Sequence, residues 1–304
     1  MTAFVFPGQG SQYAGMGKDL AENFPLARTT FEEANDALGI DLAKLCFEGP
    51  EEDLKLTANT QPAIVAASIA ALRVMHEETG LTPQFVAGHS LGEYAALVCA
   101  GAFSFEDAVR TVRQRGIFMQ DAVPVGIGTM AAIIGLDSQV VDAVCKEVAE
   151  DEIVAPANYN SPGQIVIAGH VAAVQRAMDL AKERGAKRAL PLPVSAPFHC
   201  LLMQPAANQL ETVLAAVAVA ELNCPVVSNV DAIANRDAQA VRDLLVRQVY
   251  SPVRWEESVV TMIDAGVERF VEIGPGKVLA GLIKRIAKGA AIQNIGTVAD
   301  LKTF

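Results

Sequence analysis

The chain has 304 residues, of which 51% are hydrophobic and 19% charged, so it can bury one large core or two moderate ones. It carries 24 Lys and Arg against 35 Asp and Glu, and this formal charge of −11 should repel phosphate backbones and anionic lipids, which excludes nucleic acid and membranes as expected partners. No apolar run reaches the roughly 18 to 20 residues of a membrane span, and the start MTAFVFPGQG lacks secretory features, so we expect a cytoplasmic location.

The first part of the chain alternates short apolar runs with helical periodicity, which is typical of α/β proteins. We expect strands at residues 3–6 and 85–87, and helices at 25–38, 61–78, 92–100 and 104–121. Ser104 followed by Asp107 gives the last of these helices a capping start.

From residue 126 the pattern of apolar and polar residues changes. The expected order is strand 129–134, helix 138–149, strands 153–157 and 164–168, helix 171–184 and strand 188–192. This β-α-β-β-α-β order predicts a ferredoxin-like small domain over residues 126–196. We expect it to be inserted into an α/β-hydrolase-like large domain with a parallel sheet, formed by residues 1–125 and 197–304. The later elements are expected as helices 202–220, 238–250, 255–265 and 277–288, and strands 226–229 and 270–273.

The most specific motif is Gly88-His89-Ser90-Leu91-Gly92, a G-x-S-x-G sequence between an expected strand and an expected helix. In this setting it is typical of a nucleophile elbow, whose small flanking residues allow a tight turn that lifts the serine oxygen to the start of a helix. The bare pattern also arises by chance, so the interpretation depends on the setting. We predict that Ser90 is a nucleophile.

A serine becomes a good nucleophile only when a base lies within hydrogen-bond reach. Of the four histidines, His89 is expected to support the turn, while His76 and His170 are expected to be structural or solvated. His199 lies downstream of the serine, the order found in α/β hydrolases, and is the best candidate base. No acidic residue stands out as a third member, and a backbone carbonyl could orient the imidazole equally well.

Two backbone N–H groups are candidates for stabilising an oxyanion. Gly8-Gln9-Gly10-Ser11 follows the first strand, and such a glycine turn can aim N–H groups at developing negative charge. The N–H of Leu91, directly after the nucleophile, is the standard second donor. The glycine turn is a weak signal alone, because most such turns only reverse the chain.

Several sequence blocks together resemble the malonyl-CoA:acyl carrier protein transacylase family of bacterial fatty acid synthesis. In chain order they are FVFPGQGSQYAGMG, TQPA, GHSLGEYAAL, QRGIFMQ, NYNSPGQIVIAG, PVSAPFH and EIGPGKVL, which extend over nearly the whole chain. The resemblance implies that Ser90 is acylated and that His199 is its base. It also implies that Gln9 and Leu91 supply the oxyanion N–H groups, and that the main-chain carbonyl of Gln248 steadies the histidine.

The resemblance further implies residues that select the acyl group. Arg115 would bind the free carboxylate of malonate, and Gln61 and Asn158 would line the site. A guanidinium meets a carboxylate with two charge-assisted hydrogen bonds, so leaving Arg115 unpaired would penalise acetyl-CoA. From the residues alone, Arg115 would be a surface arginine. Phe198 is expected to favour malonyl over methylmalonyl groups, because its ring would crowd the α-carbon.

These roles imply a ping-pong transfer of a malonyl group from malonyl-CoA to the phosphopantetheine thiol of acyl carrier protein, supplying extender units for fatty acid synthesis. Neither half-reaction needs a Lewis acid, so we expect no metal and no cofactor, and we expect a monomer. A carrier protein is typically acidic, so local basic patches must outweigh the charge of −11. The docking hypothesis names Lys187, Arg188, Lys284 and Arg285, with Lys277 and Lys288 expected on the helix face of Lys284.

Other functions stay open at this point. A serine thioesterase would share the elbow and the histidine. A malonyl transferase could instead serve malonate decarboxylase or a polyketide synthase in trans, with the same chemistry on another carrier. A non-catalytic module that binds carrier protein would need none of Ser90, His199 and Arg115, whose presence argues against it.

Overall fold

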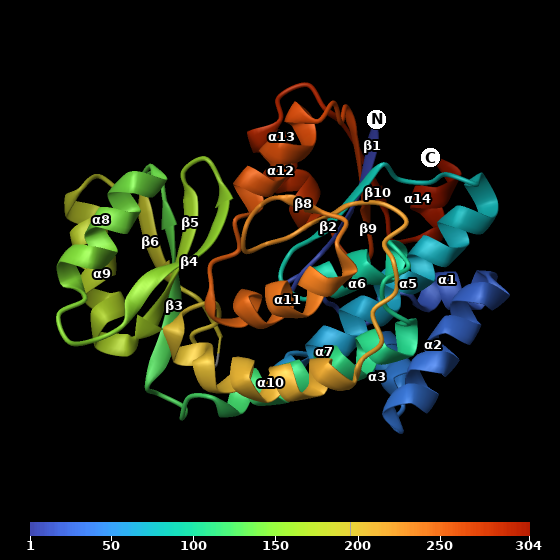
Figure 1. Cartoon of the computed structure of the whole chain (residues 1–304), viewed down its shortest axis with the longest axis horizontal. Coiled ribbons are helices and arrows are strands. Elements are labelled where there is room, and N and C mark those ends of the chain that lie inside the picture. Colours follow the sequence, from blue (N-terminus) through green and yellow to red (C-terminus); the bar gives the residue numbers. More distant parts are fainter. Residues whose placement is uncertain (195) are drawn as a thin grey trace.

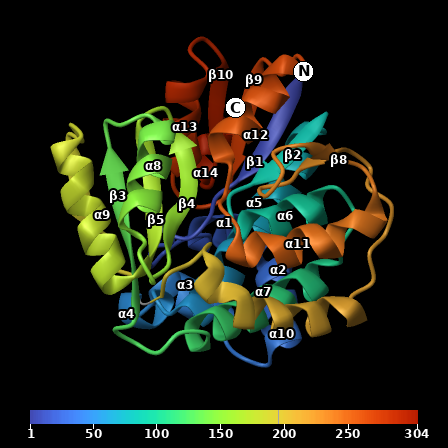
Figure 2. The same ribbon diagram turned by 60° about the vertical axis from the view of Figure 1, so that its left-hand side comes forward.

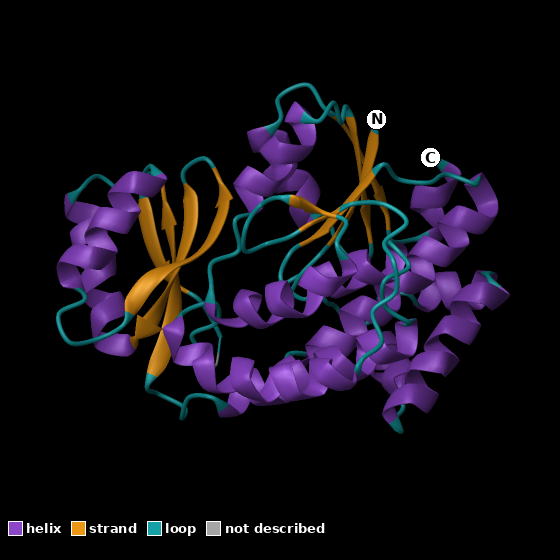
Figure 3. Cartoon of the chain, viewed as in Figure 1, coloured by secondary structure: helices purple, strands orange, loops and turns teal. Residues whose placement is uncertain are grey.

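The computed structural model describes residues 1–194 and 196–304. Two separate β-sheets, each packed against helices, make up the molecule (Figures 1 and 3). The strands of the large sheet are β1 (Thr2–Phe6), β2 (Phe85–Gly88), β7 (Val226–Val227), β8 (Ala234–Asn235), β9 (Arg269–Ile273) and β10 (Ala291–Ile295). The strands of the small sheet are β3 (Gly128–Ile134), β4 (Val154–Ser161), β5 (Gln164–His170) and β6 (Arg188–Pro191).

The helices surround these two sheets. The α-helices are α1 (Lys18–Asn23), α2 (Pro25–Leu38), α3 (Leu42–Glu48), α4 (Glu51–Leu54), α5 (Thr57–Thr79), α6 (Gly92–Cys99), α7 (Phe105–Asp121), α8 (Ser138–Val148), α9 (Val171–Glu183), α10 (Gln204–Ala216), α11 (Val241–Tyr250), α12 (Trp255–Asp264), α13 (Val278–Ile286) and α14 (Val298–Lys302). Short 3₁₀ turns η1 (Leu201–Met203) and η2 (Ala238–Ala240) precede α10 and α11. Among the described residues, no helix has the length and apolar character that crossing a membrane requires.

The large sheet has the strand order β10-β9-β1-β2-β7-β8, with β8 antiparallel to β7 and the other neighbours parallel. Helices pack on both of its faces, with α5 and α6 on one and α12 and α13 on the other. Strand β1 is therefore buried on both sides: Phe4 and Phe6 join the core under α5 and α6, while Ala3 and Val5 join the core under α12 and α13. This arrangement confirms the predicted parallel sheet.

The small sheet is antiparallel, with the strand order β4-β5-β3-β6, and α8 and α9 cover one face. This is the split β-α-β order that the sequence predicted. The helices α8 and α9 lie on the side of the small sheet that faces away from the large sheet (Figure 2). The edge strand β4 pairs with the segment before α12, where Tyr159 N donates to Val253 O at 2.9 Å and Val253 N donates to Ala157 O at 2.8 Å. The division into a small domain over 126–196 and a large domain of the two flanking segments stays a prediction.

Some predicted elements were too long. The helix expected over 202–220 ends at Ala216, because the next residues run extended and pair with the loop after α6: Ala220 N donates to Ala102 O and Asn223 N to Ala100 O. The helix expected over 277–288 covers only α13, so Lys277 and Lys288 do not share its face. The sequence pattern also did not predict α1, α3, α4, β8, β10 and α14.

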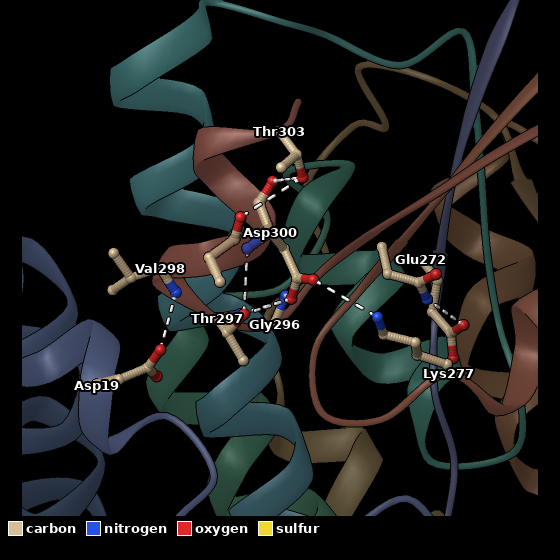
Figure 4. A network of polar contacts seen from close by, with 10 residues as sticks. Asp19, Glu272, Lys277, Gly296, Thr297, Val298, Asp300 and Thr303 are labelled. Atoms are coloured by element: carbon tan, nitrogen blue, oxygen red, sulfur yellow. Dashed lines mark hydrogen bonds and ion pairs between the residues drawn. The ribbon is translucent and has the colours of Figure 1, made fainter.

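Polar contacts tie the C-terminal helix α14 to α1 and to the loop before α13 (Figure 4). Val298 N donates to Asp19 Oδ2 at 2.8 Å, and Thr297 and Asp300 form a reciprocal cap at the start of α14. Lys277 Nζ lies 3.7 Å from Asp300 Oδ1. Lys277, considered a docking cation from the sequence, therefore already has an anionic partner.

Candidate active site

Ser90 lies on a tight turn between β2 and α6, with φ of 52°. Left-handed backbone is costly for a residue with a side chain, and such strain persists only where the surroundings fix it. The flanking glycines explain how the turn fits: a Cβ on Gly88 would lie 1.9 Å from the backbone of Gly92, and one on Gly92 would lie 2.3 Å from Phe6 O. Only glycine at both positions lets the turn pack this closely against the end of β1.

His199 is in direct contact with this serine. Its Nε2 lies 2.7 Å from Ser90 Oγ, and its Nδ1 lies 2.9 Å from Gln248 O. Because a carbonyl oxygen can only accept, Nδ1 carries the proton, which leaves Nε2 free to accept from the serine hydroxyl. Burial, followed by the nearby charge of Arg115, lowers the pKa of His199 to about 3, against the opposing hydrogen bond to Gln248 O. The imidazole is therefore neutral at physiological pH.

Arg115 comes from α7 and is only 1% exposed, so it is not a surface arginine. Its Nη1 donates to Gln61 Oε1 at 2.7 Å, and its Nη2 donates to Gln248 Oε1 at 2.9 Å and to Ser90 Oγ at 3.0 Å. Its guanidinium carbon lies 5.8 Å from the centre of the Tyr94 ring. Burial lowers the pKa of Arg115, and its Nε has no hydrogen-bond partner among the described residues. A buried cation held by neutral oxygens, beside a nucleophile, is well placed to receive an anion.

These side chains open into a cavity of about 130 Å³ between the two sheets. Its lining is Gln9, Gln61, His89, Ser90, Leu91, Arg115, Met119, Met130, Asn158, Leu192, Val194, Phe198 and His199. Every predicted catalytic, oxyanion and substrate-binding residue thus lies on one cavity. Throughout residues 1–194 and 196–304, the backbone N–H groups of Gln9 and Leu91 donate no hydrogen bond, so both are available to a ligand.

The other histidines are occupied elsewhere. His89 Nε2 lies 2.9 Å from Asn160 Oδ1 and the ring packs against Trp255, so it supports the turn as expected. His170 Nδ1 accepts from Ile153 N at 2.9 Å, and the exposed His76 contacts a backbone oxygen. None of these three contacts Ser90 Oγ in the described structure.

Two buried polar residues next to the turn, Asn229 and Glu93, were not predicted from the sequence. Asn229 Oδ1 accepts from Ser90 N at 2.7 Å, and Glu93 Oε2 accepts from Asn229 N at 2.9 Å. Burial raises the pKa of Glu93 to about 7. The only signals in the sequence were that Asn229 ends an expected strand and that Glu93 falls one helical turn after the serine. Both patterns are too common to have singled these residues out.

The four hypothesised docking residues lie outside the cavity lining, and all are exposed. Lys284 and Arg285 are on α13, and Arg285 Nη1 donates to Gln164 Oε1 at the start of β5. Lys187 precedes β6 and packs against Gly135, while Arg188 is the first residue of β6. Gln164 and Arg188 both pair with Ile134 of the central strand β3. The two basic pairs therefore gather at one end of the small sheet.

Comparison with known proteins shows the family to which the chain belongs. A family model described as the acyl transferase domain matches residues 3–302. The malonyl CoA-acyl carrier protein transacylase of Escherichia coli (strain K12) is 56% identical over 284 residues, which cover 93% of this chain and 92% of that protein. The structure of the corresponding protein from Coxiella burnetii superposes with a TM-score of 0.97 at 47% identity, covering 99% of this chain and 96% of that one.

A second solved structure contains a malonyl-transacylase in complex with its type II PKS acyl-carrier protein. It superposes with a TM-score of 0.97 at 53% identity, covering 99% of this chain and 98% of that one. With relatives this similar over nearly the full length, the resemblance noted in the sequence is confirmed, and the chain belongs to the malonyl CoA-acyl carrier protein transacylase family of acyl transferases.

Proposed function

We propose that this protein is a malonyl-CoA:acyl carrier protein S-malonyltransferase that works through a malonyl-serine intermediate. The observation that carries this proposal is the convergence of two groups on Ser90 Oγ, which lies 2.7 Å from a neutral His199 Nε2 and 3.0 Å from the buried Nη2 of Arg115. The first contact activates a nucleophile, and the second places a cation where an acyl group carrying a carboxylate would lie.

In the first half-reaction, His199 Nε2 takes the proton of Ser90 as its Oγ attacks the thioester carbonyl of malonyl-CoA. The tetrahedral oxyanion is stabilised by the free N–H groups of Gln9 and Leu91. When the C–S bond breaks, the imidazolium gives its proton to the leaving CoA thiolate, which leaves malonyl-Ser90 and neutral His199. Gln248 O stabilises the imidazolium that forms between these two steps, because it accepts from Nδ1–H at 2.9 Å.

In the second half-reaction, the phosphopantetheine thiol of acyl carrier protein gives its proton to His199 and attacks the ester carbonyl of malonyl-Ser90. The same oxyanion donors serve, and collapse returns the proton to Ser90 Oγ. The product is malonyl-carrier protein, and the free serine is restored. The relative solved with a type II PKS acyl-carrier protein supports a carrier as acceptor.

Arg115 gives the reaction its selectivity. Its partners Gln61 and Gln248 are neutral, so a malonate carboxylate would be the anion in direct contact with the buried guanidinium. Acetyl-CoA would leave this cation without an anion in direct contact, which a polar site penalises strongly. Asn158 and Phe198 line the same cavity, and the ring of Phe198 restricts the space for substituents on the α-carbon.

Carrier docking is assigned to the basic residues at the end of the small sheet: Lys187, Arg188, Lys284 and Arg285. They come from two distant parts of the chain and meet through Gln164 and Ile134. A local cluster of this kind can attract an acidic carrier although the net charge of the chain is −11.

A polyketide synthase carrier is the second candidate acceptor, because the relative complexed with such a carrier is 53% identical to this chain. The chemistry on Ser90 is the same in both cases. Rates measured with a fatty acid and a polyketide carrier protein would distinguish them.

The test of the proposed function is mass spectrometry of the intact protein after adding malonyl-CoA, acetyl-CoA or methylmalonyl-CoA without carrier protein. A malonyl adduct on Ser90 is expected, with little acetyl adduct, and holo-carrier protein should then remove the malonyl group. If CoA is released continuously into water and no adduct accumulates, the protein is a thioesterase instead. If no adduct forms and no CoA is released, the enzymatic assignment fails.

A further inference from the structure

Three buried polar side chains meet at the turn that carries the nucleophile, and none of them lines the cavity. Glu93 comes from α6, Asn229 follows β7 and Gln248 comes from α11, and they are 3%, 0% and 1% exposed. Three elements far apart in the sequence thus place a carboxylate and two amides together. Burying this much polar surface is unfavourable unless each group is satisfied by hydrogen bonds.

Glu93 is the acceptor that connects the two amides. Its Oε2 accepts from Gln248 Nε2 at 2.9 Å and from Asn229 N at 2.9 Å. The side chain of Asn229 holds the backbone of the nucleophile turn at two points: it accepts from Ser90 N at 2.7 Å and donates to Gly88 O at 2.7 Å. The strained backbone of the nucleophile is therefore held by Asn229, whose own backbone is held by Glu93.

Gln248 contacts Ser90, His199 and Arg115. Its backbone oxygen accepts from His199 Nδ1, its Nε2 donates to Ser90 O at 3.0 Å, and its Oε1 accepts from Arg115 Nη2 at 2.9 Å. An amide can be turned either way, and the carboxylate of Glu93 acts with Ser90 O and Arg115 to fix the orientation of this one. With an acceptor on one side and a guanidinium on the other, only one orientation puts Nε2 toward Glu93 and Oε1 toward Arg115.

We infer that Glu93 is a positioning residue for acyl transfer, which acts through Gln248 and Asn229 to hold Ser90, His199 and Arg115 in their productive arrangement. It does not touch the cavity, so it does not bind substrate. The inference rests on the proposed function, because it concerns the rate of the same Ser90 acylation. Small displacements of reacting groups are expensive: a shift of about 1 Å can lower a rate by about 100-fold.

Glu272 provides a matched control. It is also a fully buried glutamate, on β9 (Figure 4). It accepts from Leu279 N, Ala280 N and Asn294 Nδ2 at 2.8 to 2.9 Å. It caps α13 and has no contact with Ser90, His199 or Arg115 in the described structure. Removing either carboxylate leaves buried N–H groups without an acceptor, so both changes should lower stability, but only one should slow the chemistry.

The experiment compares Glu93→Ala, Glu93→Asp and Glu93→Gln with Glu272→Ala. The rate of malonyl-Ser90 formation is measured by rapid-quench mass spectrometry, per folded molecule, below the melting temperature of each variant. We expect Glu93→Ala to reduce the saturating rate about 100-fold and Glu93→Asp, whose carboxylate falls short, about 10-fold. Glu93→Gln should stay within about threefold of the parent, because its Oε1 can accept both hydrogen bonds. Glu272→Ala should keep the parent rate.

A second readout reports on the geometry. The Nδ1–H proton of His199 should shift in the NMR spectrum of Glu93→Ala and not in that of Glu272→Ala, since only the former releases Gln248. The inference is overturned if Glu93→Ala and Glu93→Asp acylate within threefold of the parent, or if Glu272→Ala slows acylation as much. If the parent protein itself forms no malonyl-Ser90, it is the proposed function that fails.

Discussion

Replacing Arg115 with alanine gives the sharpest test of how this site selects its acyl group. The guanidinium is buried and makes its hydrogen bonds to the neutral oxygens of Gln61, Gln248 and Ser90. A malonate carboxylate would add two charge-assisted hydrogen bonds, each contributing about 1.5 to 3 kcal/mol. Their sum of about 3 to 6 kcal/mol corresponds to a loss of roughly 10² to 10⁴ in kcat/KM for malonyl-CoA.

Acetyl-CoA should respond differently to the same change. It has no carboxylate to lose, so its kcat/KM should fall only by the shared effect of loosening Ser90 and Gln248, about tenfold. The assay is CoA release with each thioester in the presence of saturating carrier protein, and the quantity of interest is the malonyl-to-acetyl ratio of kcat/KM.

Arg113 is the matched control for this prediction. It lies on the same helix, α7, but donates to Ala58 O and Asn59 Oδ1 away from the cavity. Arg113→Ala should therefore leave the ratio unchanged. If Arg115→Ala lowers malonyl and acetyl transfer by the same factor, Arg115 is not the carboxylate-binding residue and the reasoning from its unpaired charge is wrong.

Three further predictions follow from the structure. Because the pKa of His199 is lowered to about 3, the acidic limb of kcat/KM for malonyl-CoA should lie well below pH 6.5, and a limb near pH 6.5 would contradict a buried, neutral His199 as the base. An unfolded histidine binds a proton below about pH 6.5 while the folded one does not, so this residue should also make the free energy of unfolding rise with pH from about 3 to 6.5. Reversing the charges of Lys284 and Arg285 to glutamate should raise KM for carrier protein without changing KM for malonyl-CoA, and an unchanged carrier KM would refute the docking surface. Gly92→Ala should destabilise the fold by about 3 kcal/mol in denaturant titrations, since its Cβ would lie 2.3 Å from a backbone oxygen of β1. Gly281→Ala, at a helical position with no atom near the added Cβ, should instead stabilise the fold by about 0.5 to 1 kcal/mol. Equal effects of the two changes would show that the turn can accommodate a side chain at position 92.

The elements that the sequence predicted well share a strong local signal. Helix α2 begins at Pro25 and ends at Leu38 as expected, with a proline in its first turn and a glycine in the left-handed conformation after its end. Ser104 caps α7 by accepting from Asp107 N at 3.0 Å. In these cases the local sequence determines where the helix begins and ends, because capping residues and helix breakers act within a few residues.

The errors arise where distant contacts set the conformation. Residues 217–220 have helical character, yet they run extended because Ala220 N finds Ala102 O, more than a hundred residues away. Strand β10 was missed because its pattern is weak, and it forms by pairing with β9 at the edge of the large sheet. Local propensity is a small free energy that such tertiary contacts readily override.

The residues of the site likewise divide into those predicted from the sequence and those whose role depends on the tertiary structure. The sequence alone predicted the turn around Ser90, because the residues of an elbow are constrained by their neighbours in the chain, and it predicted His199 as the base from its position downstream of the serine. The environment of Arg115 was decided by the tertiary structure: its helix could have faced water, and only packing against α5 and the turn buries its guanidinium beside the nucleophile. The roles of Glu93 and Asn229 could not be predicted from the sequence, because a buried polar residue acquires its role through the hydrogen-bond partners that folding brings to it.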